Sequence, residues 1–363
     1  MAEADAIWAL GCMSGTSMDG VDAAMVLSDG FEVFEFGATG YRPYSKAERA
    51  VIAAAQGRWP GEAGVAEAAA LVDEVHGELI SRFGGVQLVG YHGQTLAHEP
   101  GGRGTHQAGD GARLAKICGL PVAWDFRSAD VAAGGQGAPL APFYHFALAV
   151  RMNLGAVAFL NLGGVGNVTF VDPDAPSPEA EGALLAFDTG PANALMDDFA
   201  VRRTGLACDY GGALAATGRV DQEIVAAFLG HEYFARSPPK SLDRNDFAFL
   251  SEAVAGLSDN DGLATLAACT IGAVREGFTH VPFAVGKVLV CGGGRKNPHL
   301  MAGLAAALAM PVVDVEQAKL DGDMLEAQAF GYLAVRAQAG LALSAPGTTG
   351  VAAPLSGGRI SQP

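Results

Sequence analysis

The sequence predicts an α/β protein built from two related halves. Each half opens on an apolar strand, a glycine-rich turn and a second strand, at residues 6–28 and again at residues 156–171. Helical patterns of apolar residues alternate with short apolar strands along the rest of the chain. A length of 363 residues corresponds to roughly two domains. We place one domain over residues 1–140 and the second over residues 141–363, and leave open whether the C-terminal tail packs back on the first.

The composition supports a large folded core and argues against some classes of binding partner. Half of the residues are hydrophobic and 17% are charged, which argues against disorder. The net charge of −16 argues against nucleic acid or an anionic membrane as the partner. A nucleotide ligand stays possible, because Mg²⁺ and backbone N–H groups can supply local positive potential.

The cysteines and the N-terminus predict a cytoplasmic protein. The five cysteines are scattered and no CxxC occurs, so neither a zinc site nor a disulfide framework is expected. Unpaired cysteines fit a reducing compartment. Residues 1–6 lack the basic residues of a signal peptide, and no apolar stretch has the length of a membrane span.

The first hairpin is a candidate phosphate-binding element. Residues 7–13 and 21–27 read as strands, and the turn between them holds two glycines, three hydroxyls and the carboxylate of Asp19. Glycine lets the backbone approach an anion closely, and Asp19 could hold a cation beside it. The turn is not a Walker A loop, because it lacks the lysine and precedes a strand. An ordinary glycine-rich hairpin explains the pattern equally well.

Polar residues follow three predicted strand elements in the first half. They occupy residues 92–95, 105–111 and 125–127, and α/β sheets bind ligands at such strand ends. Each alone is more often a solvated loop, but the three together favour a ligand site. The stretch 129–142 is rich in glycine, alanine and proline, and we interpret it as a linker or hinge near a domain boundary.

Two motifs of the second half have functional and structural interpretations. Asp188 follows a buried strand, and Pro191 suits the first position of a helix. A helix N-terminus would keep the carboxylate ionised, so Asp188 is equally a candidate general base and a helix cap. Residues 292–294 are three glycines between a strand and a helix that begins near His299. This pattern suits approach to a nucleotide, or simply close packing.

Motifs spread over nearly the whole chain resemble those of the anhydro-N-acetylmuramic acid kinases. They lie at residues 11–22, 92–95, 107–111, 125–127, 134–140, 161–164, 187–191 and 291–294. Two departures stand out: Ala192 replaces a glycine of the family pattern, and residues 240–244 read Lys-Ser-Leu-Asp-Arg in place of Lys-Ser-Thr-Gly-Arg.

The resemblance implies the fold of the sugar kinase, actin and heat-shock chaperone superfamily, in which two ribonuclease-H-like domains hold ATP in the cleft between them. It implies nucleotide contacts from the two hairpins and the glycine turn: Gly15, Thr16, Ser17, Met18, Asp19, Gly20, Val21, Asp22, Asn161, Gly163, Gly164, Gly292, Gly293, Gly294 and Asn297. It implies sugar contacts from His92, Gln94, Thr95, Gln107, Asp110, Arg127 and Asp188. Asp188 would be the catalytic base, and Asp19 would support Mg²⁺.

The reaction implied is ATP-dependent opening of 1,6-anhydro-N-acetylmuramic acid with phosphorylation of its 6-oxygen, in cell-wall sugar recycling. The resemblance also suggests a homodimer. Two alternatives remain: an ordinary sugar kinase acting on a free hydroxyl, and a non-catalytic nucleotide switch of the actin or chaperone kind. The polar strand ends favour a sugar pocket over a switch.

Overall fold

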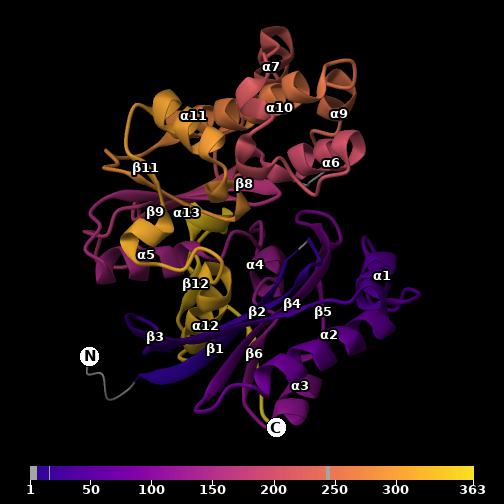
Figure 1. Cartoon of the computed structure of the whole chain (residues 1–363). Helices are drawn as coiled ribbons and strands as arrows, with labels where there is room; N and C mark the ends of the chain where they lie inside the picture. Colours follow the sequence, from indigo (N-terminus) through magenta and orange to yellow (C-terminus); the bar gives the residue numbers. More distant parts are fainter. Residues whose placement is uncertain (1–5, 16, 243–245) are drawn as a thin grey trace. The chain divides into compact units, whose positions relative to one another are not determined.

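The computed structural model describes residues 6–15, 17–242 and 246–363, which form two compact units. The first unit comprises Met1–Asn153, Ser177–Glu179 and Met324–Pro363, and the second comprises Leu154–Pro176 and Ala180–Asp323. Figure 1 labels most of the elements of both units.

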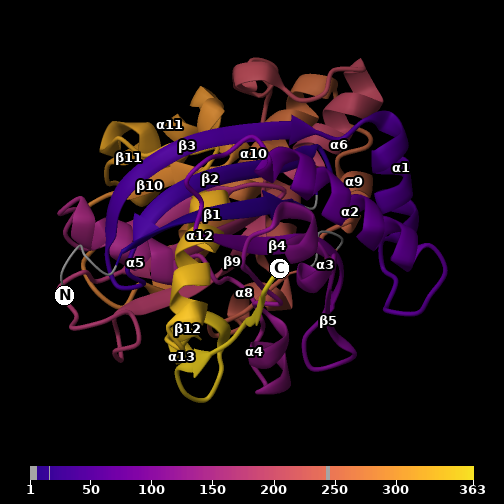
Figure 2. The ribbon, with the colours of Figure 1, turned by 90° about the horizontal axis from the view of Figure 1, so that it is seen from below.

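The first unit is built on a mixed sheet. Its strands are β1 (Ile7–Ser14), β2 (Gly20–Ser28), β3 (Val33–Pro43), β4 (Leu88–Glu99), β5 (Gly104–Ala108), β6 (Val122–Trp124) and β14 (Arg359–Ser361). The order is β14-β6-β4-β1-β2-β3, with β5 paired to β4. The neighbours β1, β2 and β3 are antiparallel, whereas β4 runs parallel to both β1 and β6. Figure 2 shows β1, β2 and β3 side by side.

Helices cover both faces of this sheet. On one face, apolar side chains of β1 and β2 pack with those of α2 and α3. On the other face, α12 lies directly against β1 and β4. Arg336 anchors the end of α12 by donating to the carbonyls of Gly30 and Ala342 and by pairing with Glu179. The helices of the unit are α1 (Lys46–Ala55), α2 (Val65–Ile80), α3 (Gly111–Cys118), α4 (Ser128–Ala132), α5 (Pro142–Arg151), α12 (Leu325–Gln338) and α13 (Pro346–Thr349).

The second unit repeats the same strand arrangement. Its strands are β7 (Val157–Leu162), β8 (Val165–Val171), β9 (Leu184–Pro191), β10 (Val288–Cys291) and β11 (Val312–Asp314). The order is β11-β10-β7-β8-β9, in which β7, β8 and β9 are antiparallel and β10 runs parallel to β7 and β11. The order β6-β4-β1-β2-β3 in the first unit is the same, both in the succession of the strands along the chain and in their directions. The predicted α/β fold with two related, ribonuclease-H-like halves is therefore confirmed.

The long helix α10 organises the helical part of the second unit. It packs on α6, α7 and α11, and it also contacts β9. Apolar side chains of these helices form one core cluster, and a second cluster lies between the sheet and α10. The main helices are α6 (Asn193–Thr204), α7 (Gln222–Leu229), α8 (Glu232–Ala235), α9 (Phe249–Ala253), α10 (Asp259–Gly277) and α11 (Pro298–Leu308).

The units divide at residues 153/154 and 323/324, whereas the sequence analysis placed its division at 140/141. Helix α5 stays with the first unit because the Tyr144 hydroxyl donates to Gln328 Oε1 at 2.9 Å. The stretch 129–142 is not a linker, because it lies inside the first unit. There the buried carboxylate of Asp130 accepts hydrogen bonds from Ser344 Oγ at 2.5 Å and Thr349 Oγ1 at 2.6 Å.

Among the described residues, none of the helices combines the length and the apolar character needed to cross a bilayer.

Backbone meets backbone where α12 crosses β1 and β4. A Cβ atom on Gly11 would lie 1.8 Å from the carbonyl oxygen of Ala327, and one on Gly90 would lie 2.0 Å from that of Phe330. Both distances are far below van der Waals contact, and the obstacle in each case is backbone. The sheet and the helix can therefore reach this separation only with glycine at the two strand positions.

We expect Gly90→Ala to lower the free energy of unfolding by about 1–3 kcal/mol or more, because α12 must move to make room for the methyl group. The measurement is the midpoint of thermal or urea unfolding. Gly84→Ala is the matched control, since Gly84 is exposed and a Cβ atom added there would meet no other atom within 4 Å. An unchanged midpoint for Gly90→Ala would contradict the close approach.

Candidate active site

The first hairpin turn presents small polar groups at its exposed tip. Met18 adopts φ +54°, and its N–H donates to the Gly15 carbonyl at 3.1 Å. The Ser17 hydroxyl donates to Asp19 Oδ1 at 2.6 Å, and both residues are exposed. Gly20, Val21 and Asp22 belong to β2, where the Val21 side chain is buried in the core and leaves only its backbone for a ligand. Thr16, also predicted to bind nucleotide, lies outside the described residues.

Gln94 supports the hairpin from the neighbouring strand. Its Oε1 accepts from Ser14 Oγ at 2.5 Å, and its Nε2 donates to the Gly15 carbonyl at 3.1 Å. Both ends of this amide are thus used inside the protein. In this structure Gln94, predicted as a sugar contact, fixes the base of the first hairpin turn.

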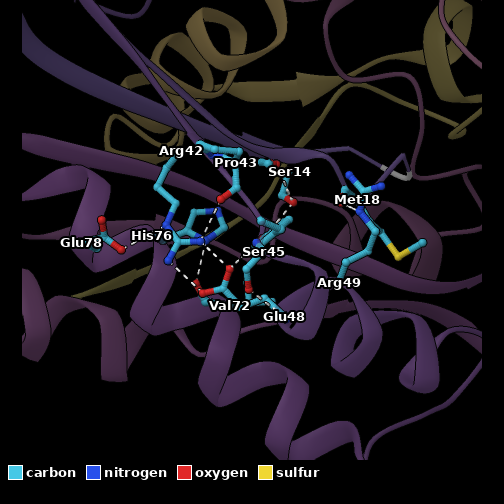
Figure 3. Close-up of polar contacts among 12 residues, drawn as sticks. Ser14, Met18, Arg42, Pro43, Ser45, Glu48, Arg49, Val72, His76 and Glu78 are labelled. Atoms are coloured by element: carbon cyan, nitrogen blue, oxygen red, sulfur yellow. Dashed lines mark hydrogen bonds and ion pairs between the residues drawn. The ribbon is translucent and has the colours of Figure 1, made fainter. Parts of the chain in front are cut away.

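An ion network that the sequence analysis did not consider holds α1 against the hairpin (Figure 3). Arg42 binds the Glu48 carboxylate through two nitrogens, at 2.5 and 2.8 Å, and Glu78 at 3.0 Å. Hydrogen bonding to Arg42 lowers the pKa of Glu48 to about 2. From α1, Arg49 Nε then donates to the Met18 carbonyl at 2.9 Å. The network therefore fixes one side of the turn.

The structure brings His92 and Arg127 together. His92 Nδ1 lies 2.8 Å from the Gly93 carbonyl, so this nitrogen carries the proton and Nε2 accepts from Arg127 Nη2 at 3.0 Å. Burial, and then the Arg127 charge, hold the pKa of His92 well below its usual range. Burial also lowers the pKa of Arg127, to about 10. At neutral pH the pair is therefore a neutral imidazole and a guanidinium cation.

Glu326 is a charged neighbour of this pair that the sequence analysis missed. It lies in the first turn of α12, and its negative charge raises the pKa of Arg127. Nothing in the local sequence links the last helix to residue 127, because only the packing of α12 on the sheet brings the two charges near each other.

The other predicted sugar contacts of the first unit have roles within the fold. Gln107 Nε2 donates to Thr95 Oγ1 at 3.2 Å and to Thr105 Oγ1 at 2.8 Å, which forms a polar ladder between β4 and β5. Asp110 caps α3 by accepting from the N–H groups of Ala112 and Arg113. Sugar binding by these residues stays a prediction.

Asp188 does not lie at a helix N-terminus. Strand β9 continues through Pro191, because it pairs with β8 as far as Val165, and α6 begins only at Asn193. The expectation that Pro191 opens the helix is therefore wrong. The helix-cap interpretation of Asp188 is wrong as well, since the cap position is Ala192 and the Asp188 carboxylate bonds elsewhere.

The surroundings of Asp188 tune its carboxylate. Oδ2 accepts from the Leu242 N–H at 2.8 Å, the backbone N–H donates to the Lys240 carbonyl at 3.0 Å, and the backbone carbonyl accepts from the Tyr233 hydroxyl. Burial raises the pKa of Asp188 to about 7, against the lowering effect of the Leu242 N–H. A carboxylate that titrates near neutrality suits general base catalysis.

Two glycine turns of the second unit lie against each other. Gly292 adopts φ +72°, and a Cβ there would lie 2.3 Å from Asn161 Oδ1. The carbonyls of Gly163 and Gly164 accept from the N–H groups of Asn193 and Ala192. The glycines of 292–294 lead into a 3₁₀ turn, Gly293–Lys296, before α11 begins.

Asn297 has a structural task beside this turn. Its Oδ1 caps α11 by accepting from the N–H groups of His299 and Leu300, at 3.1 and 3.2 Å. Nucleotide binding by Asn297 and by the glycine turns stays a prediction.

A Mg²⁺ site built wholly from protein is not found: within 6–15, 17–242 and 246–363 no three His, Cys, Asp or Glu residues could hold a metal ion together. Mg²⁺ bound with phosphates commonly needs only one or two carboxylates. The exposed Asp19 beside Ser17 fits that requirement.

Comparison with known proteins identifies relatives along the whole chain. A sequence model of the family described as anhydro-N-acetylmuramic acid kinase matches residues 7–363. The protein of that name from Cereibacter sphaeroides is 64% identical over 364 residues, covering 100% of this chain and 98% of the relative. That from Roseobacter denitrificans is 56% identical, covering 100% and 96%.

Among solved structures, component A of (R)-2-hydroxyglutaryl-CoA dehydratase from Acidaminococcus fermentans aligns with a TM-score of 0.47 and 13% identity, covering 92% of this chain and 99% of that one. The full-length family match and the identity to its members show that the chain belongs to the anhydro-N-acetylmuramic acid kinase family.

Proposed function

We propose that this chain uses ATP to phosphorylate 1,6-anhydro-N-acetylmuramic acid while water opens the anhydro ring. The products are N-acetylmuramic acid 6-phosphate and ADP, an outcome that serves the recycling of cell-wall sugars. The observation that carries the proposal is the family match over residues 7–363.

The chemistry of the substrate defines the task of Asp188. In the anhydro sugar the 6-oxygen is bonded to the anomeric carbon, so no free 6-hydroxyl exists. The 6-oxygen forms a bond to the γ-phosphorus of ATP, ADP leaves, and the bond between the 6-oxygen and the anomeric carbon breaks. A water oxygen bonds to the anomeric carbon, and Asp188 takes one of its protons. Oδ2 already accepts the Leu242 N–H, so we assign the proton to Oδ1.

The phosphate end of ATP needs positioning and charge neutralisation more than covalent chemistry. We assign positioning to the exposed turn at Ser17 and Asp19 and to the glycine turns of the second unit. Asp19 would hold Mg²⁺, which supplies charge neutralisation on the phosphate oxygens when bound.

Arg127 is the cation among the predicted sugar contacts. N-acetylmuramic acid carries a carboxylate on its lactyl group, and a guanidinium binds carboxylates through two parallel hydrogen bonds. Because the pKa of Arg127 is about 10, the side chain stays charged at neutral pH. We assign it to this carboxylate, with His92 holding its orientation through Nε2.

We also propose a reducing, cytoplasmic location and a homodimer. None of the five cysteines, which all lie in the described part of the chain, forms a disulfide, and this fits a reducing compartment. The homodimer rests on the resemblance to the family.

Asp188→Asn should lower kcat by about 10²–10⁴-fold while ATP and sugar still bind, because the amide cannot accept the proton from water. Single-turnover assays and calorimetric titration measure the two effects. In water labelled with heavy oxygen, the wild-type product should carry the label on its anomeric carbon. Label in the phosphate, or full activity of the variant, would contradict the assignment. Asp174→Asn, in an exposed loop, is the matched control.

The pH profile should follow the same carboxylate. Since Asp188 must be ionised to act and its pKa is raised to about 7, kcat/KM should rise with pH through about 7 and then level off. Steady-state rates across the range in which the protein stays folded measure this limb. A limb near the ordinary aspartate value of 3.8 would show that another group controls the rate.

Arg127→Met should raise KM for the anhydro sugar at least about tenfold, since hydrogen bonds to charged groups contribute about 1.5–3 kcal/mol. KM for ATP should change little. Arg82→Met, on the surface of the same unit, controls for loss of a positive charge. A larger effect on ATP than on sugar would reassign Arg127.

A further inference from the structure

The chain from α8 through residue 242, named here the loop 233–242, holds Asp188 at three points. The Tyr233 hydroxyl donates to its carbonyl, the Lys240 carbonyl accepts from its N–H, and the Leu242 N–H donates to its Oδ2. Two of these contacts fix the backbone and the third fixes the carboxylate. The position of Asp188 therefore depends on the shape of this loop.

Lys240 holds the loop in that shape. Its Nζ donates to the carbonyls of Tyr233 at 3.1 Å and of Arg236 at 2.9 Å. The same ammonium lies over the Tyr233 ring, at 4.6 Å from the centroid, and 5.8 Å from that of Phe187. The Lys240 side chain thus joins residues 233 and 236, at the start of the loop, to its own position near the end. It also contacts Phe187, the residue before Asp188.

Burial of the Lys240 ammonium costs free energy that its contacts must offset. Lys240 is only 4% exposed, and burial lowers its pKa. Burying an ammonium is unfavourable unless its donors are satisfied, and here carbonyl oxygens and aromatic faces compensate for the lost water. An apolar residue of similar length would fill the space without that cost, but it could not bind two carbonyls at once.

We propose that Lys240 is a positioning residue for Asp188, which it holds in place through the loop 233–242 without contacting the substrate. The proposal rests on the proposed role of Asp188 as the base. Without the ammonium, the carbonyls of residues 233 and 236 lose their shared donor, and the loop can move away from β9. The Leu242 N–H then leaves Oδ2.

The consequence for the base has a definite sign. The Leu242 N–H stabilises the ionised carboxylate, so its loss raises the pKa of Asp188. The acid limb of kcat/KM must then move to higher pH. Among the described residues, the other titratable groups that act on this site are Asp246 and Tyr233 beside Asp188, and Arg236 and His280 beside Lys240. A substitution at residue 240 keeps these four side chains, but it removes the charge of Lys240, which lowers the pKa of His280.

The test compares Lys240→Met with Lys46→Met, which removes an exposed lysine at the start of α1. For Lys240→Met we expect kcat to fall roughly ten- to a hundredfold, KM for ATP to stay constant, and the acid limb to move upward. Carbon NMR of labelled aspartate, assigned with Asp188→Asn, measures the pKa of Asp188 without relying on activity. Lys46→Met should match the wild type in every measurement.

Tyr233→Phe provides a second variant, because it keeps the ring and carbonyl that Lys240 contacts but removes the hydroxyl. In a double-mutant cycle its effect on kcat and that of Lys240→Met should be strongly non-additive, since both act through one loop. If Lys240→Met does not fold, Tyr233→Phe alone must still lower kcat and change the Asp188 pKa.

Three outcomes separate the proposals. If Lys240→Met keeps the wild-type Asp188 pKa and acid limb, the positioning role is overturned, even if kcat falls through general loss of stability. If the pKa moves as expected and Asp188→Asn loses activity, the positioning role is supported. If Asp188→Asn keeps its activity, the proposed base is wrong, and the NMR result alone decides whether Lys240 positions this carboxylate.

Discussion

The backbone contact between α12 and the strands β1 and β4 is the constraint on which the first unit depends. Gly11 and Gly90 allow the helix to lie against the sheet, and this places the first turn of α12, with Glu326, near Arg127. The chain beyond α12 then returns Ser344 and Thr349 to the buried Asp130. One close approach thus connects the C-terminal segment to the loop that carries Arg127 and so to the predicted sugar contacts.

The second unit uses the same strand order for a different purpose. In the first unit the third strand, β3, holds the arginine that anchors α1. In the second unit the third strand, β9, carries Asp188, and the chain at residues 240–242 binds along it. Backbone groups at the free edge of a strand need partners, and this loop supplies them beside the carboxylate of Asp188, the proposed base. The repeated fold therefore gives both units the same strand arrangement. The contacts of residues 240–242 along β9 distinguish the surroundings of Asp188 from those of the equivalent strand in the first unit.

Sequence patterns predicted the helices and strands of this protein better than they predicted the surroundings of individual site residues. The two hairpins, the helical stripe of α2 and the strand before residues 292–294 all follow from local patterns of apolar residues and glycine, and so does the duplicated fold. Asp110 and Asn297 each stand directly before a helix, which is a local pattern typical of helix caps. The sequence analysis assigned them to ligand binding instead, because of the family motifs. The partners of Asp188 had no such signal, because residues 233–242 reach it through tertiary packing. Leu242 stands where the family pattern has threonine. The contact with Asp188 does not depend on this difference, because only the backbone N–H of residue 242 takes part.

The difference between the predicted and observed settings of Asp188 changes how its chemistry is explained. A helix N-terminus would lower the pKa of a carboxylate and so weaken it as a base. On strand β9 the main effect is burial, which raises the pKa to about 7, while one N–H from Leu242 acts in the opposite direction. A base of this kind is half ionised near pH 7 and largely ionised above it, and it still binds a proton strongly enough to take one from water. The basicity of Asp188 is then set by burial and by one hydrogen bond, so the proposed role of the carboxylate as a base depends on the loop that supplies that bond.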